Sequence, residues 1–274
     1  RIKIKNLKIK DFFKKRKTII VAKDVAIELS IKNLLKRKEH NFKKIKLKNF
    51  EIYFNLKDLK KYRKIFGKEV DFIPVIFDKG KIIFNDDKKN VATIRDVDLI
   101  IKFIKNTTFA NLKGKILNDN IEIKFNEKKI DNMFSSDLSL KLSNLKLLTK
   151  INFSDYKKGK NSLNGNILIK KDKNKITGLF HYKDNELIIE KSNLRNSFVD
   201  GKMEGKITLL PFFNYNLDIN LNSINFTKLY SYFLSLDEKN KKKIFKINNK
   251  INGDVILSAN KIYSSYNLIK SFES

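Results

Sequence analysis

Few residues of this 274-residue chain have the types and spacing that catalysis or metal binding needs. Histidine occurs only at His40 and His181 and cysteine is absent, so no zinc cluster, thiolate or histidine-based triad can be assembled from recognisable spacings. The acidic pairs Asp86-Asp87 and Asp237-Glu238 stand at a turn and near a helix start, where carboxylates are common for structural reasons. We therefore predict no catalytic residue, no metal site and no cofactor, and a protein that is not an enzyme.

The formal net charge of +30 raises nucleic acid or an anionic membrane surface as a partner. The positive charge is almost all lysine, and arginine, the usual reader of guanine edges, is scarce. Four residue types with AT-rich codons are all abundant, namely lysine, asparagine, isoleucine and phenylalanine. Genome composition therefore accounts for much of the positive charge. No motif of a known nucleic-acid-binding fold is present, and we predict no specific nucleic-acid partner.

A recurrent slip interrupts the strand-like alternation of apolar and polar residues. In FKKIKLKNFEIYF, residues 42–54, the apolar residues Ile45 and Leu47 hold odd positions, and Phe50, Ile52 and Phe54 hold even ones. Similar polar pairs interrupt four more strand patterns: Lys5-Asn6, Arg95-Asp96, Ser143-Asn144 and Asn222-Ser223. A β-bulge or a tight hairpin turn would each place residues three apart on one face, and we expect bulges. The first four slips lie about 43 to 48 residues apart, which indicates a repeated structural unit.

The remaining chain is dominated by short strand patterns separated by polar turns, which predicts an all-β fold built from a curved antiparallel sheet. Two helical patterns interrupt it, one over residues 55–67 and one near residues 226–246. Five glycines stand in the middle of strand patterns on the apolar parity: Gly114, Gly165, Gly178, Gly205 and Gly253. Glycine there serves a bulge, a bend or a close approach of the backbone, which fits a strongly curved sheet.

Three segments resemble the N-terminal region of the AsmA-like family of envelope proteins. They are residues 17–54, with Leu34-Leu35 before the strand that holds Ile45 and Phe54; residues 75–104, with VIFDKGKIIFNDD and VATIRDVDLIIKF; and residues 224–262, with INFTKLYSYFLSL and KINGDVILSANKI. The resemblance is one of pattern over most of the chain, and none of its motifs is catalytic. Asn49 stands where the family often has proline, and the N-terminal membrane helix of the family is not among these 274 residues.

The resemblance implies an elongated β-groove protein of the periplasm, anchored to the inner membrane and related to the TamB and YhdP type of bridge. Such proteins bind phospholipid acyl chains and contribute to lipid transport toward the outer membrane. It also implies a family region over residues 1–150 and a continuation of the groove over residues 151–274. Candidate groove residues flank the slips: Leu47, Phe50, Ile52, Phe54, Ile94, Val97, Leu99, Leu142, Leu145 and Leu147.

An alternative remains open at this point. A sheet with one apolar face and few helices either leaves that face uncovered or buries it against a second sheet. The second arrangement is a β-sandwich scaffold or adhesin with a closed core. The chain starts at Arg1 within a strand pattern, and from this we expect the gene to encode an apolar run of about 20 residues upstream, long enough to span a bilayer.

Overall fold

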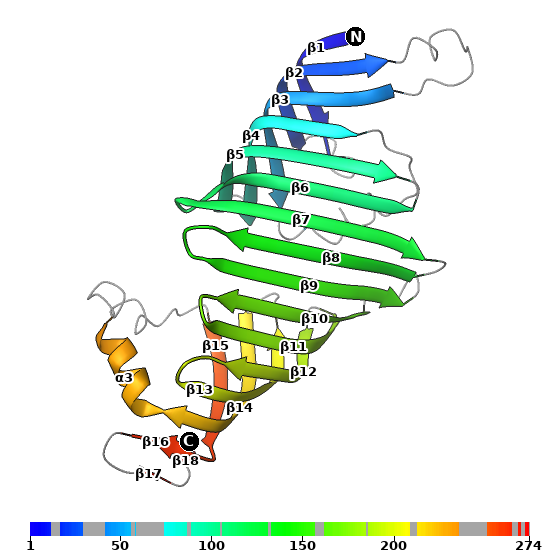
Figure 1. Ribbon diagram of the computed structural model, residues 1–274. Helices are drawn as coiled ribbons and strands as arrows, with labels where there is room; N and C mark the ends of the chain where they lie inside the picture. Colours follow the sequence, from blue (N-terminus) through cyan, green and yellow to red (C-terminus); the bar gives the residue numbers. More distant parts are fainter. Residues whose placement is uncertain are drawn as a thin grey trace. The chain divides into compact units, whose positions relative to one another are not determined.

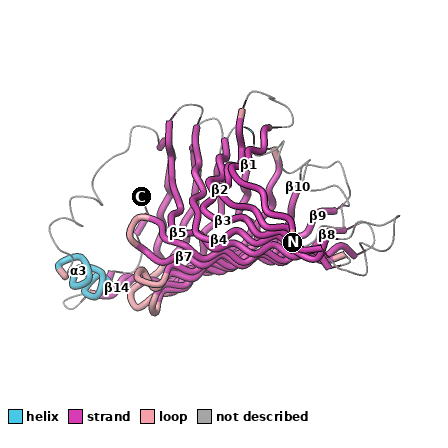
Figure 2. Tube along the Cα trace, turned by 90° about the horizontal axis from the view of Figure 1, so that it is seen from above, coloured by secondary structure: helices cyan, strands magenta, loops and turns pink. Residues whose placement is uncertain are grey.

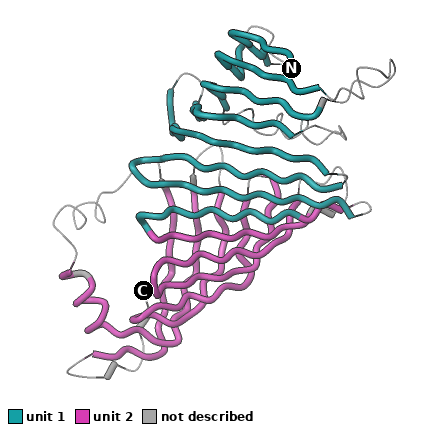
Figure 3. The backbone as a smooth tube through the Cα atoms, turned by 45° about the horizontal axis from the view of Figure 1, so that its top comes forward, with its two compact units in different colours: residues 1–130, 136–145 teal, residues 131–135, 146–274 magenta. Residues whose placement is uncertain are grey.

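The computed structural model describes residues 1–11, 17–29, 42–55, 58, 74–86, 89–104, 106–130, 133–156, 162–184, 186–208, 213–235, 251–264, 268–269 and 272–273. The chain divides into two compact units (Figure 3). Unit 1 contains residues 1–130 and 136–145, and unit 2 contains residues 131–135 and 146–274.

Unit 1 is a single sheet (Figure 1). Its strands are β1 (Ile2–Lys10), β2 (Thr18–Leu29), β3 (Phe42–Asn55), β4 (Val75–Asp86), β5 (Lys89–Ile104), β6 (Thr107–Ile116), β7 (Asp119–Ile130) and β8 (Met133–Leu142), of which β8 enters unit 1 at Ser136. Each of the strands β1 to β6 pairs with the next one along the chain. The Ser143 N–H donates to the Asn120 carbonyl at 3.0 Å, next to the turn that ends β8.

Unit 2 repeats this arrangement with strands of about the same length. Its elements are β9 (Leu147–Tyr156), β10 (Ser162–Lys171), β11 (Asn174–Lys183), β12 (Glu186–Arg195), β13 (Val199–Thr208), β14 (Phe213–Asn225), α3 (Phe226–Leu234), β15 (Ile251–Ala259), β16 (Ile262–Tyr263), β17 (Leu268–Ile269) and β18 (Phe272–Glu273). Strands β9 to β15 pair in chain order.

The all-β fold class is confirmed, because strands make up nearly all of the described chain and form a curved sheet in each unit (Figures 1 and 2). Two pairings differ from the expected antiparallel pattern. Strands β3 and β4 are parallel, and so are β14 and β15. Parallel neighbours need a crossover of a dozen or more residues, and each pair is joined by one of the two segments with a helical pattern.

One predicted helix is present in the described part of the chain. Helix α3 begins where expected, and the Asn225 side chain caps it by accepting the Lys228 N–H at 2.9 Å. The continuation toward residue 246 lies outside the described residues from 236 onward. The helix predicted over residues 55–67 also lies outside them, except for Asn55 at the end of β3 and Asp58.

Of the bulges predicted at the first three slips, the one at Asp96 is confirmed, because the register of β5 shifts there against both β4 and β6. At Asn6 and Asn49 the registers do not shift, so the neighbouring strands bend there without a register-shifting bulge. Asn6, Asn49 and Asp96 adopt left-handed backbone angles, with φ of 56°, 50° and 51°. The registers place Asn6, the unpaired Lys23 of β2, Asn49 and the left-handed Lys79 of β4 at one level across the sheet. Asp96 lies next to that level, on the other side of the Gly80–Val97 pair. We call these five residues the bulge row. Strands β1 to β5 bend along their length (Figure 1).

The bulge row leaves the pairing registers of β1, β2 and β3 unchanged. Between β1, β2 and β3 the pairing keeps one register on both sides of Asn6, Lys23 and Asn49, because each strand carries its irregular residue at the same level. The row ends at β6, where the register with β5 shifts by one residue between Arg95 and Asp98. A single bulge there is accommodated by Gly114, since an added Cβ would stand 2.9 Å from the Arg95 carbonyl oxygen.

The chain spacing of the slips follows from this line. Asn6, Asn49 and Asp96 belong to every second strand, β1, β3 and β5, so the chain returns to the bulge row after each pair of strands. The spacing therefore reflects the path of the chain through one sheet and does not mark a separate repeated unit.

The last two slips have different outcomes. At Asn222 a bulge is confirmed, because Ser223 pairs with Asp200 and Leu221 pairs with Gly201. At Ser143-Asn144 the bulge prediction is wrong, because β8 ends at Leu142 and a turn precedes β9. The Asp119 carboxylate, which is buried, holds this turn by accepting the Asn144 N–H at 2.8 Å and the Leu145 N–H at 3.0 Å.

Two glycines make room for aromatic rings of the neighbouring strand, and at Gly253 this confirms the predicted close approach. An added Cβ on Gly80 would lie 2.3 Å from the Phe50 ring, and one on Gly253 would lie 2.6 Å from the Tyr215 ring. Phe50 is 1% exposed and meets Phe77 edge to face, with the ring centroids 5.0 Å apart. The glycine of β4 thus makes room for the largest fully buried side chain of unit 1.

We predict that Gly80→Ala destabilises unit 1 by about 1–3 kcal/mol, because the buried Phe50 ring has no free space into which it can move. Gly178→Ala is the matched control, since its new Cβ would meet nothing closer than 3.4 Å. Chemical denaturation followed by circular dichroism measures both. Equal midpoints for the two variants would contradict the role assigned to Gly80.

A second prediction concerns the ion pair beside the bulge row. The hydrogen bond from Lys46, whose Nζ lies 2.8 Å from Asp78 Oδ2, lowers the pKa of Asp78 below its ordinary value of 3.8. A carboxyl whose pKa is lower in the folded state stabilises the fold above its unfolded pKa and loses that contribution as the pH falls through the folded pKa. We expect Asp78→Asn to cost about 0.2–1 kcal/mol at neutral pH and nothing in acid below that pKa.

The control for this pair is Asp96→Asn. The Asp96 side chain is 70% exposed in its pair with Lys115, and asparagine also tolerates the left-handed backbone at this position. Urea denaturation at several pH values should show a pH-dependent difference from the parent for Asp78→Asn and a smaller one for Asp96→Asn. A difference for Asp78→Asn that persists unchanged into acid would argue against the ion pair.

Candidate functional site: an apolar sheet face

One face of the unit 1 sheet is lined by continuous rows of apolar side chains. Strand pairing aligns them residue by residue across the sheet. The first row contains Ile2, Ile27, Ile45, Val75, Ile101, Ala110 and Phe125, and the second contains Ile4, Val25, Leu47, Phe77, Leu99, Leu112 and Ile123. The third, on the other side of the bulge row, contains Ile9, Ile20, Ile52, Ile82 and Ile94. We call these rows, with the apolar residues between them, the apolar face of unit 1.

Burial on the apolar face is graded. Ala22, Phe50 and Val97, beside the bulge row, are at most 1% exposed, whereas Ile2 in the first row is 45% exposed. All members of the buried cluster and the side chains packed against it belong to strands β1 to β8. Among the described residues, the side chains that bury this cluster therefore come from the bent sheet itself, and no second layer of described residues covers the first row.

This arrangement differs from the β-sandwich alternative. A sandwich buries the inner face of each sheet along its whole length against a second sheet about 10 Å away. The described strands of unit 1 all belong to one sheet. The first row is only half-buried, as expected for a sheet face that no second sheet covers.

The predicted groove residues fall into three groups. Leu47, Phe50, Ile52, Ile94 and Val97 are fully buried beside the bulge row. Phe54, Leu99 and Leu142 are half-buried and pack against this cluster.

The two remaining candidates lie elsewhere. Leu145 is 52% exposed in the turn after β8, because the expected bulge is a turn, and Leu147 is half-buried on β9 of unit 2, where it pairs with Lys171.

Sequence reasoning missed half of the buried cluster, although a signal was present. Ala22 and Val25 flank the polar pair Lys23-Asp24, and Phe77 and Gly80 flank Asp78-Lys79, in the same spacing as the recognised slips. These strands were missed because their apolar runs are denser, so the change of parity at the polar pair is less visible.

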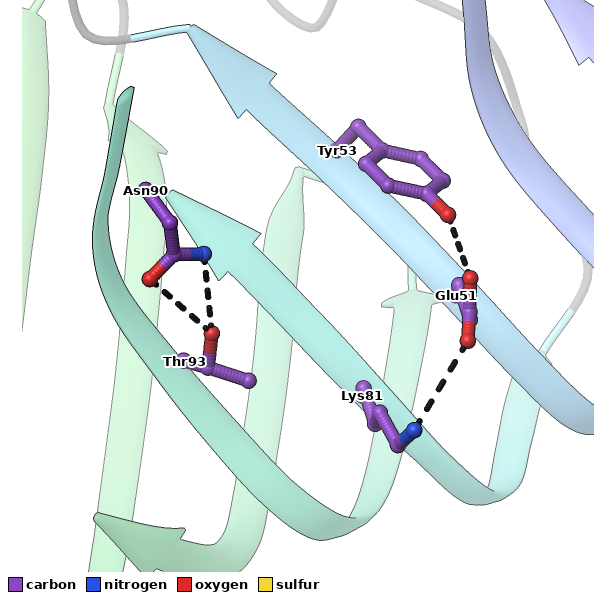
Figure 4. A network of polar contacts seen from close by, with 5 residues as sticks. All are labelled: Glu51, Tyr53, Lys81, Asn90 and Thr93. Atoms are coloured by element: carbon purple, nitrogen blue, oxygen red, sulfur yellow. Dashed lines mark hydrogen bonds and ion pairs between the residues drawn. The ribbon is translucent and has the colours of Figure 1, made fainter. Parts of the chain in front are cut away.

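The opposite face of the same strands is polar. Glu51 of β3 accepts a hydrogen bond from the Tyr53 hydroxyl and pairs with Lys81 of β4, with Nζ and Oε1 3.8 Å apart (Figure 4). The hydrogen bond to Glu51, with burial and the nearby negative charge, raises the pKa of Tyr53 to about 12. On β5, Asn90 Nδ2 donates to Thr93 Oγ1 at 3.1 Å. This side of the sheet is therefore suited to contact with solvent.

Unit 2 has an apolar face of its own. Strand pairing aligns a row of Leu163, Tyr182, Leu187, Ile207 and Tyr215, and a second row of Ile169, Ile176, Leu194, Gly201, Leu221 and Ala259. Only the end of this face is fully buried, in a cluster of Leu221, Ile224, Ala259 and Ile262. These four residues flank the polar pairs Asn222-Ser223 and Asn260-Lys261, so the spacing seen beside the bulge row recurs on β14 and on the segment from β15 to β16.

Polar chemistry of a catalytic kind is not assembled in the part of the chain that the structure describes. His181 Nδ1 hydrogen-bonds Asn164 Oδ1 on the neighbouring strand, and His40 lies outside the described residues. Within the described ranges no three His, Asp or Glu side chains converge as a metal site would need. The same ranges contain no helix with the length and apolar character to cross a membrane.

Comparison with known proteins gives no further guide to function. No protein-family model, no curated protein and no solved structure matches this chain. The apolar faces of the two units are therefore the features on which a functional proposal rests.

Proposed function

We propose that this protein is a non-enzymatic segment of an AsmA-like envelope protein that binds phospholipid acyl chains along the apolar faces of its sheets. In this proposal it acts in the periplasm and contributes to lipid transport between the inner and outer membranes. The observation that carries the proposal is the first row of unit 1, which is apolar at every position from Ile2 to Phe125 and is not covered by a second layer of described residues.

The size of the face supports a ligand. Scattered exposed apolar residues are normal on any protein, but a contiguous apolar surface marks a site of interaction. The first row alone crosses seven neighbouring strands, from β1 to β7, and the second row runs beside it. Such a surface has an unfavourable free energy in water and favours a partner that covers it.

The chemistry of the face favours acyl chains over a protein surface. None of the three rows contains a side chain that donates or accepts a hydrogen bond. A protein partner brings polar groups that need about one hydrogen bond per 100–200 Å² of interface. A hydrocarbon chain has no polar groups, so a uniformly apolar lining is a suitable contact surface for it.

The proposal is tested with two adjacent residues of β5 that point to opposite faces. Ile101 belongs to the first row, and Ile100 is on the polar face, where it is 38% exposed. We expect Ile101→Glu to reduce the phospholipid that co-purifies with the protein about threefold or more, because a charge in a hydrocarbon contact has no partner. Native mass spectrometry of protein prepared from its own membranes measures the bound lipid.

Ile100→Glu is the matched control and should leave lipid content unchanged, with equal circular dichroism melts for both variants. A photo-crosslinking residue should label phospholipid from position 101 and not from position 100. Charged substitutions at Phe50 or Val97 are unsuitable probes, since burial there makes them unfold the sheet. Absence of phospholipid from the parent protein, or equal labelling from both positions, would refute the proposal.

A further inference from the structure

Helix α3 presents more apolar surface than its sheet covers. It packs against β16, its residue Leu229 contacts the buried cluster of unit 2, and the rings of Tyr232 and Phe198 are 5.6 Å apart. These contacts occupy one side of the helix. Phe226, Tyr230 and Leu234 are spaced four residues apart, so they form a stripe along an adjacent side.

The stripe is exposed to solvent. Phe226 is 42% exposed, Tyr230 63% and Leu234 54%. In a surface helix of a globular protein the apolar side faces the core and the outward side is polar. Here the apolar arc extends well beyond the packed side, and the polar residues Thr227, Lys228 and Ser231 take up what is left of the circumference.

The charge carried by α3 itself is positive. Lys228 is the single ionisable side chain outside tyrosine in α3, and no acidic residue stands in the helix. Lys261, just before the strand that α3 packs against, is exposed as well. With a net charge of +30 on the chain, a second copy of this protein would be repelled, whereas an anionic surface would be attracted.

We propose that the stripe of Phe226, Tyr230 and Leu234 docks unit 2 onto an anionic membrane, lying in the plane of the head groups. Amphipathic helices of this kind bury their apolar side at the boundary between head groups and acyl chains, and tyrosine is enriched at that depth. The inference deepens the proposed lipid-binding function and rests on it, since α3 directly follows β14 and would bring the apolar face of unit 2 close to a source of lipid.

The absence of tryptophan from the chain gives a direct test. In the full chain, Tyr230→Trp introduces a single indole on the stripe, and Val91→Trp introduces one at a similarly exposed site, 57%, on β5. On addition of vesicles of phosphatidylglycerol and phosphatidylcholine, emission from position 230 should shift to shorter wavelength, and emission from position 91 should not. Equal shifts at both positions, or equal shifts with vesicles of phosphatidylcholine alone, would overturn the inference.

Charge substitutions give a second readout. Tyr230→Glu with Leu234→Glu should raise the vesicle dissociation constant roughly tenfold or more, because two side chains lose their apolar contact with the bilayer. Val91→Glu with Leu117→Glu is the control, because it changes the net charge by the same amount at exposed sites of unit 1. This control should raise the vesicle dissociation constant about twofold or less. Co-sedimentation with vesicles measures both, and equal loss of binding in the two double variants would overturn the inference.

The lipid content of the same preparations separates this inference from the function it rests on. Co-purified phospholipid with no vesicle binding by the parent protein would overturn the membrane contact and leave the proposed function standing. Vesicle binding through α3 by a protein that carries no phospholipid would support the membrane contact and count against the proposed function.

Discussion

The structure of unit 1 depends on one backbone constraint, which is that five neighbouring strands carry an irregular residue at the same or an adjacent level. A single bulge bends one strand and shifts its register against the next, which turns the following side chains to the other face. When neighbouring strands all carry one, the sheet bends as a whole and the pairing on both sides stays aligned. The bulge row thus allows apolar side chains to remain on one face through a sharp bend.

The consequences of the bend are both energetic and functional. Side chains beside the bulge row, such as Phe50 and Val97, converge and are fully buried, and all the described residues that pack with them belong to the same sheet. In the first row, farther from the bulge row, the side chains are only half-buried. Each strand therefore has a buried part and a partly exposed part. The buried part provides the cohesion of the unit, and the exposed part is the surface on which the proposed acyl chains bind.

Unit 2 uses the same elements in a different proportion. Its fully buried cluster is confined to β14 and the segment from β15 to β16, where polar pairs again separate the buried residues by three positions. The crossover that makes β14 and β15 parallel includes α3, and the connection between the parallel strands β3 and β4 has a helical pattern in the sequence. A long crossover beside an irregular strand is therefore shared by the two units, and in unit 2 the described helix of this crossover has an exposed apolar stripe.

The sequence by itself determined the all-β class, most strand positions and the bends at Asn6, Asn49 and Asp96, because alternation and its interruption are local properties of the backbone. It also identified, as groove candidates, residues next to those bends, of which Leu47, Phe50 and Val97 are fully buried in the structure. It did not distinguish a bulge from a turn at Ser143-Asn144, since both devices place residues three apart on one face and only the Asp119 carboxylate, distant in sequence, selects the turn.

Only the tertiary structure decided the pairing partners. The parallel direction of β3 and β4, the alignment of the irregular residues into one row, and the room that Gly80 leaves for Phe50 all depend on contacts between strands, which no local pattern encodes. The grading of burial from Phe50 to Ile2 has the same origin, because the exposure of a side chain is set by how far the neighbouring strands bend around it.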